Sequence, residues 1–236
     1  MPLPFEKYDS EHQKLWDSMK IIRDSAQLSV MSNRVYQHKA TYQEIERETG
    51  VPWQMVAVIH IREGGLQDVG VFKKGLHNGQ AWNRKTTIVP IGVGPFESWK
   101  DAAVHALKMK KFHTVGNWTP AKMLSALEPY NGYGYRGQGI RSPYLWASTN
   151  HQQRGKYVRD HVFDPNVMDS QMGCAAMLRF LGVGKTISPV ADGGIVGATL
   201  TFAIVFQQYI IPIVIFGAIA LGTLWMYRYF NRKNSQ

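Results

Sequence analysis

Apolar residues at helical spacing predict a mainly helical domain that begins near the N-terminus. Residues 9–30 place apolar side chains three and four positions apart among charged ones, which predicts an amphipathic first helix. Thr41 followed by Glu44 is the pattern of a capping box, so a short helix is expected to start there and to end at Gly50. A third helix is expected directly afterwards.

Residues 52–63 form an apolar run with helical spacing. Pro52 stands near the first helical position, where its fixed φ and its missing N–H are tolerated. Gly64 and Gly65 follow Glu63 directly, so we expect the helix to end at Glu63. This end places a carboxyl beside the apolar side chains of its own helix.

Glycine-rich stretches separate the remaining helical patterns. Five glycines punctuate residues 68–95, and with the β-favouring run 86–89 they predict a loop and hairpin region. Residues 130–157 are rich in glycine and tyrosine, which excludes a regular helix there.

Three further helices are expected before residue 182. Residues 98–111 have a helical pattern with Ser98 as the N-cap. A helix over 121–127 is expected to stop at Pro129, because the residue before a proline disfavours helical backbone. Small residues over 169–181 predict the helix that closes the domain.

The C-terminal region has the pattern of a membrane span. No charged residue occurs between Asp192 and Arg228, and residues 195–227 exceed the roughly 20 apolar residues that cross a bilayer. The best section of this transmembrane helix is 204–227.

A linker of glycine, serine and proline over 182–194 is expected before the span, and residues 228–236 form a basic tail after it. Aromatic residues beside the basic ones at this end fit the membrane interface. We therefore expect the protein at the bacterial inner membrane, bound to the lipid bilayer through its C-terminal helix. Two observations disagree on which side of the membrane holds the domain. The basic tail favours a cytoplasmic C-terminus, which places the domain on the other side, but no cleavable signal is visible that would direct the domain across.

The composition indicates a globular, basic protein. The chain has 236 residues, of which 44% are hydrophobic and 12% aromatic, and this fits one sizeable core plus an accessory segment. Its formal net charge of +10 favours anionic partners such as nucleic acid, anionic lipid or the bacterial envelope. The single cysteine, Cys174, has apolar neighbours and is expected in the core. The sequence contains no cofactor fingerprint and no metal-spaced cysteine and histidine set, so no cofactor or metal is expected.

Glu63 is the strongest candidate for chemistry. A carboxyl beside an apolar wall keeps its proton more readily than a solvated one, and the two glycines behind it allow a ligand to approach. Glycosidic bond cleavage needs such an acid to protonate the leaving oxygen. The second group is left open. The candidates for this second group are Asp68, Thr86, Thr87 and Glu97. Residues of these types also have ordinary structural roles in turns and strands.

Two motifs resemble the lysozyme-like superfamily. Gly50-Val51-Pro52, followed by an apolar helix that ends at Glu63, is similar to the segment that ends in the catalytic glutamate of goose-type lysozymes and soluble lytic transglycosylases. Tyr130-Asn131-Gly132 resembles the later Tyr-Asn-Ala-Gly motif beside the sugar groove, but it lacks the alanine, so only the Tyr-Asn pair matches. Residues 41–181 thus resemble a phage or prophage endolysin domain, and the C-terminal span resembles that of membrane-anchored endolysins.

The resemblance implies an α+β, mainly α, fold: a two-lobed lysozyme-like domain over residues 1–181 with a small hairpin region. It implies a muramidase that uses Glu63 as general acid on the bond between N-acetylmuramic acid and N-acetylglucosamine, for host cell lysis. Lytic transglycosylation of the same bond is the alternative. The partner is then the glycan strand of peptidoglycan, with Asn131 on the sugar's amide. Rings that could wall the groove are those of Tyr130, Tyr133, Tyr135, Tyr144 and Trp146.

Two other classes of protein are weighed against the enzyme. Residues 41–61 could form a helix-turn-helix with Gly50 in the turn, as in a membrane-anchored DNA-binding regulator. That function predicts basic residues on the exposed face of the second helix, where only Arg62 occurs, so nucleic acid is not expected as a partner. In the other class, a holin-like protein, the membrane span itself is the active part.

Overall fold

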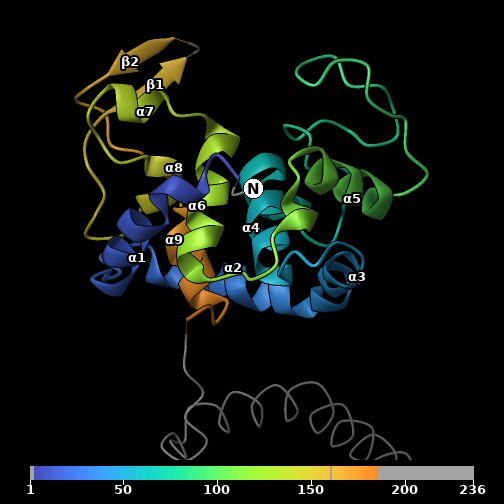
Figure 1. The fold of residues 1–236 in the computed structure, drawn as a ribbon, viewed down its shortest axis with the longest axis horizontal. Coiled ribbons are helices and arrows are strands. Elements are labelled where there is room, and N and C mark those ends of the chain that lie inside the picture. The colour runs from blue at the N-terminus through green and yellow to red at the C-terminus, as the bar shows by residue number, and fades with distance from the viewer. Residues whose placement is uncertain (1–2, 160, 185–236) are drawn as a thin grey trace, which may run out of the picture. The chain divides into compact units, whose positions relative to one another are not determined.

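The computed structural model describes residues 3–159 and 161–184, which are mainly helical with one small sheet (Figure 1). The α+β, mainly α, class is therefore confirmed. The longer helices are α1 (Asp9–Asp17), α2 (Ser25–Gln37), α3 (Lys39–Thr49), α4 (Trp53–Gly64), α5 (Trp99–Met109), α6 (Pro120–Asn131) and α9 (Cys174–Phe180). The shorter elements are η1 (Glu6–Tyr8), η2 (Leu66–Asp68), η3 (Phe112–Thr114), α7 (Gly134–Gly137), α8 (Pro143–Trp146), β1 (Lys156–Arg159) and β2 (Val162–Asp164).

Helix α4 lies in the centre of the domain (Figure 1). Every residue from Met55 to Ile61 is buried, and the helix packs on α3 and α9. Burying apolar surface stabilises the fold by about 25 cal/mol per Å². The expected end at Glu63 is confirmed to within one residue. Because residues 55–61 of α4 are all buried, this part of the helix has no exposed face that could enter a DNA groove. Helix α4 therefore does not fit the recognition helix of a helix-turn-helix.

Two helix boundaries follow local sequence signals. Gly50 ends α3 in the left-handed region, with φ +71°, as expected of a C-cap glycine. The Ser98 side chain accepts a hydrogen bond of 3.1 Å from the Asp101 N–H, which confirms Ser98 as the N-cap of α5. The capping box at Thr41 is wrong, because α3 begins at Lys39 and leaves Thr41 inside the helix.

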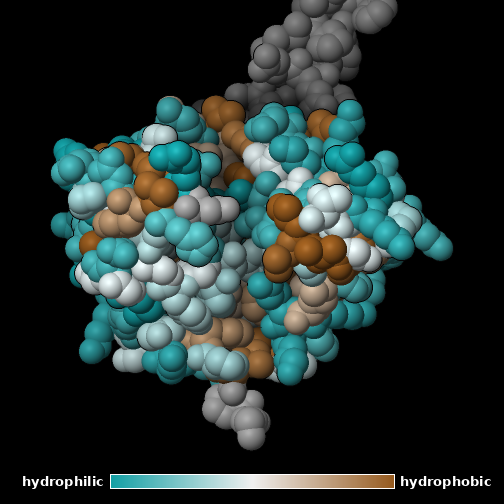
Figure 2. Space-filling view, turned by 90° about the horizontal axis from the view of Figure 1, so that it is seen from above, coloured by the Kyte–Doolittle hydropathy of each residue, from teal (hydrophilic) through white to brown (hydrophobic). Residues whose placement is uncertain are grey.

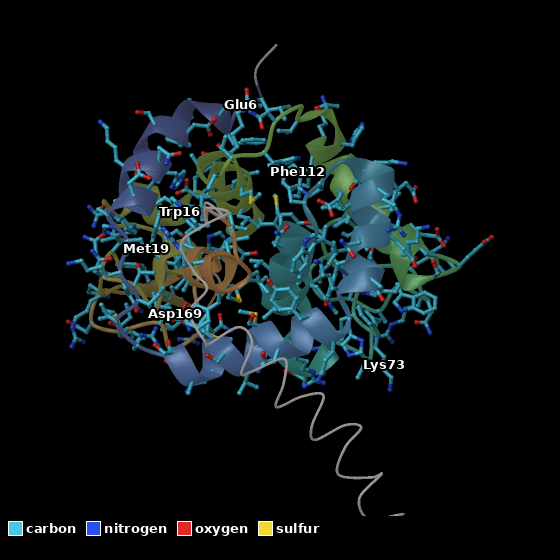
Figure 3. All side chains as sticks on the ribbon, turned by 90° about the horizontal axis from the view of Figure 1, so that it is seen from below. Glu6, Trp16, Met19, Lys73, Phe112 and Asp169 are labelled. Atoms are coloured by element: carbon cyan, nitrogen blue, oxygen red, sulfur yellow. The ribbon has the colours of Figure 1, made fainter. Side chains whose placement is uncertain are left out.

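The single helix expected over residues 9–30 is wrong. The chain forms α1 and α2 instead, separated by a segment whose backbone bonds elsewhere: Ile22 N–H donates to the Ser148 carbonyl at 3.0 Å. A tertiary contact therefore interrupts an amphipathic pattern. The helices still bury their apolar side chains, since Trp16 of α1 (Figure 3) is 3% exposed. Arg179 of α9 lies 4.3 Å over the Trp16 ring.

Two helix ends differ from expectation. Helix α6 continues through Pro129 to Asn131, so the stop predicted at Pro129 is wrong. Proline at this position removes one intrahelical N–H donor, and the helix extends only two residues beyond it. Helix α9 begins at Cys174 rather than near residue 169, because the backbone carbonyl of Asp169 accepts side-chain hydrogen bonds outside any helix. Cys174 itself is fully buried, as expected.

The hairpin expected within residues 68–95 is wrong as well. In the described part of the chain, that region has no strand and only an isolated bridge between Lys74 and Ala81. The two strands of the domain, β1 and β2, pair antiparallel within residues 156–164. In the 86–93 turn, the N–H groups of Thr87, Ile88 and Val93 donate to side chains, and those of Thr86 and Gly92 donate to carbonyls of the same turn. These bonds replace those of a strand partner, which explains why β-favouring residues form a loop.

The C-terminal predictions lie mostly outside the described residues. The described chain includes only residues 182–184 of the expected linker and none of the expected span 195–227 or tail 228–236. Within the described ranges, every helix is too short or too polar to cross a bilayer.

Candidate active site around Glu63

Glu63 occupies the last turn of α4, where its side chain is half-buried. The Tyr144 hydroxyl donates a hydrogen bond of 3.2 Å to Glu63 Oε1. Burial raises the pKa of Glu63, while the Tyr144 hydrogen bond and the charges of Arg62 and Lys110 lower it in part. The net direction is upward, so this carboxyl holds its proton to higher pH than an ordinary glutamate.

Two tyrosines accompany the carboxyl. Burial raises the phenol pKa of Tyr130 and Tyr144, and the nearby Glu63 charge raises both further. They remain protonated hydrogen-bond donors at neutral pH. Arg62 lies 4.3 Å over the Tyr144 ring and donates to the Met172 carbonyl at 3.0 Å, which fixes the ring from behind.

A hollow lies between the side of the domain that carries the sheet and the side that carries the 69–96 loop (Figure 2). On the sheet side, a cavity of about 360 Å³ is bounded by Tyr144, the Glu63 partner; we call it the Tyr144 cavity. Its lining residues are Arg62, Asn131, Tyr135, Tyr144, Lys156, Tyr157, Arg159, His161, Asp169 and Gln171. A second cavity of about 400 Å³ shares Arg62 and Gln171 with it and reaches Gly65.

The loop on the other side touches the end of α4. Gly79 has φ +66°, and a Cβ atom built there would lie 2.2 Å from the Glu63 carbonyl oxygen. Glycine is therefore required at this position both for its backbone conformation and for the close approach. The contact fixes the loop beside the candidate acid.

Asp68 has structural partners rather than a contact with Glu63. It accepts hydrogen bonds from His60 Nε2 at 2.9 Å and from the Lys74 N–H at 2.8 Å. His60 Nδ1 is 2.8 Å from the Tyr42 hydroxyl, so a buried chain of three side chains leads from α3 to the start of the loop. We infer that Asp68 positions this loop.

The other residues predicted to assist catalysis also have no hydrogen bond with Glu63. Thr86 Oγ1 bonds within its own turn, accepting from Val93 N–H at 2.9 Å. Thr87 is exposed and its N–H donates to Gln80. Glu97 is exposed as well. Among the hydrogen bonds of the described residues, Glu63 has its side-chain bond with Tyr144 and none with these candidates.

Only some of the predicted sugar-binding residues line the Tyr144 cavity. Asn131, Tyr135 and Tyr144 line the Tyr144 cavity. Tyr133 packs on Tyr8 instead, with the ring centroids 5.6 Å apart. Trp146 is 1% exposed and stacks on His12, so its ring belongs to the core and does not line the Tyr144 cavity.

The tyrosines that do reach the site differ in what they present. Tyr144 is 4% exposed, so it offers its hydroxyl rather than a ring face. Tyr135 is 6% exposed and its hydroxyl accepts from the Tyr157 N–H at 3.2 Å. Tyr130 is half-buried near Glu63. Exposed aromatic faces are therefore fewer than the sequence suggested.

Several lining residues were missed by the sequence-based prediction. They are Arg62, Tyr157, Arg159, His161, Asp169 and Gln171. Arg62 had one available signal, since it directly precedes Glu63 and cannot be buried in the apolar core without its charge being satisfied. The others lie in segments without regular periodicity, so only folding brings them to the cavity.

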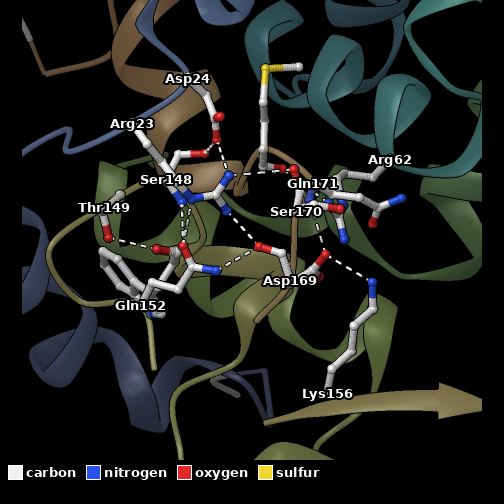
Figure 4. Close-up of polar contacts among 12 residues, drawn as sticks. Arg23, Asp24, Arg62, Ser148, Thr149, Gln152, Lys156, Asp169, Ser170 and Gln171 are labelled. Carbon is white, nitrogen blue, oxygen red and sulfur yellow. Dashed lines mark hydrogen bonds and ion pairs between the residues drawn. The ribbon is translucent and has the colours of Figure 1, made fainter. Parts of the chain in front are cut away.

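A polar network holds the cavity wall that contains Asp169 (Figure 4). Lys156 Nζ donates to Asp169 Oδ1 at 3.0 Å, and the Gln171 N–H donates to the same oxygen at 3.0 Å. Behind it, Arg23 Nη2 and Gln152 Nε2 donate to the Asp169 carbonyl at 2.6 and 2.7 Å. Asp169 is thus a held, paired carboxylate.

The described residues contain no cluster of three or more histidine, cysteine or acidic side chains arranged to hold a metal ion. Comparison of the chain with protein-family models, with curated proteins and with solved structures gives no match.

Proposed function

We propose that this protein is a peptidoglycan-cleaving glycosidase of the lysozyme-like, endolysin type, with Glu63 as general acid on the bond between N-acetylmuramic acid and N-acetylglucosamine. One observation supports the proposal above the others: a carboxyl with a raised pKa accepts a hydrogen bond from Tyr144, and Tyr144 lines a polar cavity. An acid with a raised pKa keeps its proton to higher pH and can protonate the leaving oxygen of a glycoside.

The cavity chemistry fits an anionic glycan. Arg62, Lys156 and Arg159 supply positive charge, and Asn131 supplies an amide that can pair with an acetamido group. Since Asp169 is paired with Lys156, it does not cancel the remaining two charges. Host cell lysis from the bacterial inner membrane remains a prediction, because it depends on the span outside the described residues.

Lytic transglycosylation is the second candidate function. The hydrogen-bond partners of two carboxylates, Asp68 and Asp169, favour it. Asp68 accepts from His60 and Lys74, and Asp169 accepts from Lys156, so each already has structural partners. Cleavage without a second free carboxylate can proceed through a group on the substrate itself. The sugar's own hydroxyl then closes an anhydro ring in place of water.

Digestion of purified Gram-negative sacculi tests both chemistries. We expect soluble muropeptides, whose ends distinguish a reducing sugar from hydrolysis and a 1,6-anhydro sugar from transglycosylation, as measured by mass spectrometry. Folded protein that releases neither product would contradict the proposal.

Tyr144→Phe should move the alkaline limb of the pH–rate profile to higher pH. The Tyr144 hydroxyl favours ionised Glu63, so removing it raises the Glu63 pKa and keeps the acid protonated further into the alkaline range. The measurement is the initial rate of sacculus clearing against pH.

Tyr135→Phe is the matched control, because its hydroxyl bonds to the Tyr157 N–H and makes no hydrogen bond with Glu63. An alkaline limb that stays in place with Tyr144→Phe, or that moves equally in both variants, would contradict the assignment of Glu63 as the titrating acid.

A further inference from the structure

Residues 69–96, which form most of the loop between η2 and α5, have an unusual charge distribution. They include four basic residues and no acidic one, and the acidic Glu97 follows directly after them. The basic residues are Lys73, Lys74, Arg84 and Lys85; all four are exposed, and none forms a salt bridge within the described chain. They line a cavity of about 470 Å³ whose other lining residues are uncharged. An unneutralised group of this kind attracts anions.

The tip of the same loop exposes aliphatic side chains. Ile88, Val89 and Ile91 are 54%, 73% and 75% exposed, and the last two are the most exposed large apolar side chains that the structure describes. Figure 2 shows apolar surface on the loop side of the hollow. Aliphatic groups held in water are unfavourable unless a partner covers them.

Several backbone groups of the tip are bonded within the loop. Thr87 and Ile88 N–H groups donate to Gln80 Oε1 at 2.7 and 3.2 Å, and the Val89 carbonyl accepts from the Asn78 side chain. Pro90 has no N–H to satisfy. A segment that enters an apolar medium must bond its backbone groups within the protein, because no water is available there. The tip meets this requirement for these groups before any partner binds.

We propose that the 69–96 loop is a membrane-docking loop, whose aliphatic tip inserts at the boundary between headgroups and acyl chains while its four basic residues bind anionic lipid headgroups. Aliphatic side chains are suited to acyl chains, whereas recognition of pyranose rings favours aromatic faces. Basic residues beside a membrane contribute through the negative surface potential of anionic lipids. Lipid therefore fits both halves of the loop, and the glycan fits only the charged half.

A fluorescent probe at the tip tests the proposal in the full chain. Val89→Cys is labelled with an environment-sensitive dye; native Cys174 is fully buried and burial raises its thiol pKa to about 12, so it does not compete. We expect a blue shift and a several-fold rise in emission with vesicles of phosphatidylglycerol and phosphatidylcholine. Phosphatidylcholine vesicles alone should give little change.

Val30→Cys is the matched control site, since Val30 is 61% exposed on α2 and lies outside the loop. Each dye reports its own surroundings, so a response at Val89 without one at Val30 reports insertion of the loop itself. No response of the Val89 probe to anionic vesicles, or an equal response at Val30, would overturn the proposal. A response to purified sacculi alone would overturn it in favour of a wall-binding loop.

The charge requirement is tested in the labelled protein with Arg84→Gln and Lys85→Gln together. Each basic residue at an anionic surface contributes about fivefold to binding, so the pair should raise the anionic lipid fraction needed for half of the probe response and weaken docking by more than about tenfold. Circular dichroism confirms the fold of the variant. An unchanged lipid dependence would overturn the role of these charges.

Discussion

Glu63→Gln is expected to reduce peptidoglycan cleavage by about 10²- to 10⁴-fold, the range over which a positioned general acid contributes to catalysis. The amide has the same shape and its oxygen can still accept from the Tyr144 hydroxyl, but it has no proton to give to the leaving oxygen. The measurement is muropeptide release from sacculi at equal protein concentration.

Glu97→Gln is the control, because that carboxyl is exposed at the end of the 69–96 loop and its substitution should leave the rate unchanged. Activity of Glu63→Gln within a few-fold of the wild type would remove the general-acid role. Equal losses in both variants would indicate that charge, rather than proton donation, is needed.

The same Glu63→Gln variant should be more stable than the wild type at pH 7. Burial raises the Glu63 pKa, so above its ordinary value of 4.5 the unfolded chain loses this proton more readily than the folded one, and stability falls as pH rises. Glutamine does not titrate. The difference in melting temperature should therefore shrink as the pH is lowered toward 4.5, which thermal unfolding at a series of pH values would show.

Asp68→Ala is expected to lower the free energy of unfolding by about 3 kcal/mol, since it leaves one buried donor and two partly buried donors without their acceptor. These donors are His60 Nε2 and the N–H groups of Lys73 and Lys74, at 2.9, 3.2 and 2.8 Å from the Asp68 oxygens. Urea denaturation measures the change. Because the loop depends on these bonds, cleavage should fall as well.

Asp17→Ala provides the comparison, as that carboxylate is exposed at the end of α1 and bonds only to Gln13 among described side chains. Its effect should stay within about 0.5 kcal/mol. If Asp68→Ala were as mild, Asp68 would not hold the loop, and a catalytic role for it would have to be reconsidered.

The His60 and Asp68 pair also predicts loss of stability in acid. Burial lowers the His60 pKa, although its bond with Asp68 raises it in part, so protonation disfavours the folded state once the pH falls below about 6.5. Burial opposes ionisation of Asp68, but bonds from His60 and Lys74 outweigh it and leave the Asp68 pKa lowered. Both shifts act in the same direction, and stability should fall as the pH passes below 6.5 and then below 3.8.

Part of the site was accessible from the sequence because its signals are local. Pro52, the apolar run and Gly64 lie within one helix, so the pattern fixes where α4 ends and which residue stands there. The same holds for Gly50 after α3 and for Ser98 before α5. The apolar surroundings of Cys174 likewise predicted its burial.

Other features depend on residues distant in sequence. Tyr144, 81 residues after Glu63, was one of five aromatic candidates, and nothing in the local pattern distinguishes it from Trp146. Packing decides that Tyr144 bonds to the carboxyl while Trp146 enters the core. The β-favouring run 86–89 became a turn for a similar reason, since Gln80 and Thr86 side chains supply the partners that a strand would have supplied.

Local patterns along the chain are enough to predict an acid at the end of a buried apolar helix in a basic, mainly helical domain. Helix periodicity and capping act over three or four residues, so they can be read directly along the chain. The surroundings of that acid depend on tertiary packing, which brings to it the hydroxyl of Tyr144 and the loop contact at Gly79. Packing also forms the cavity that Tyr144 lines, with its wall held by Asp169. Side-chain partners across such separations are set by how the helices and loops pack, and no local pattern encodes them.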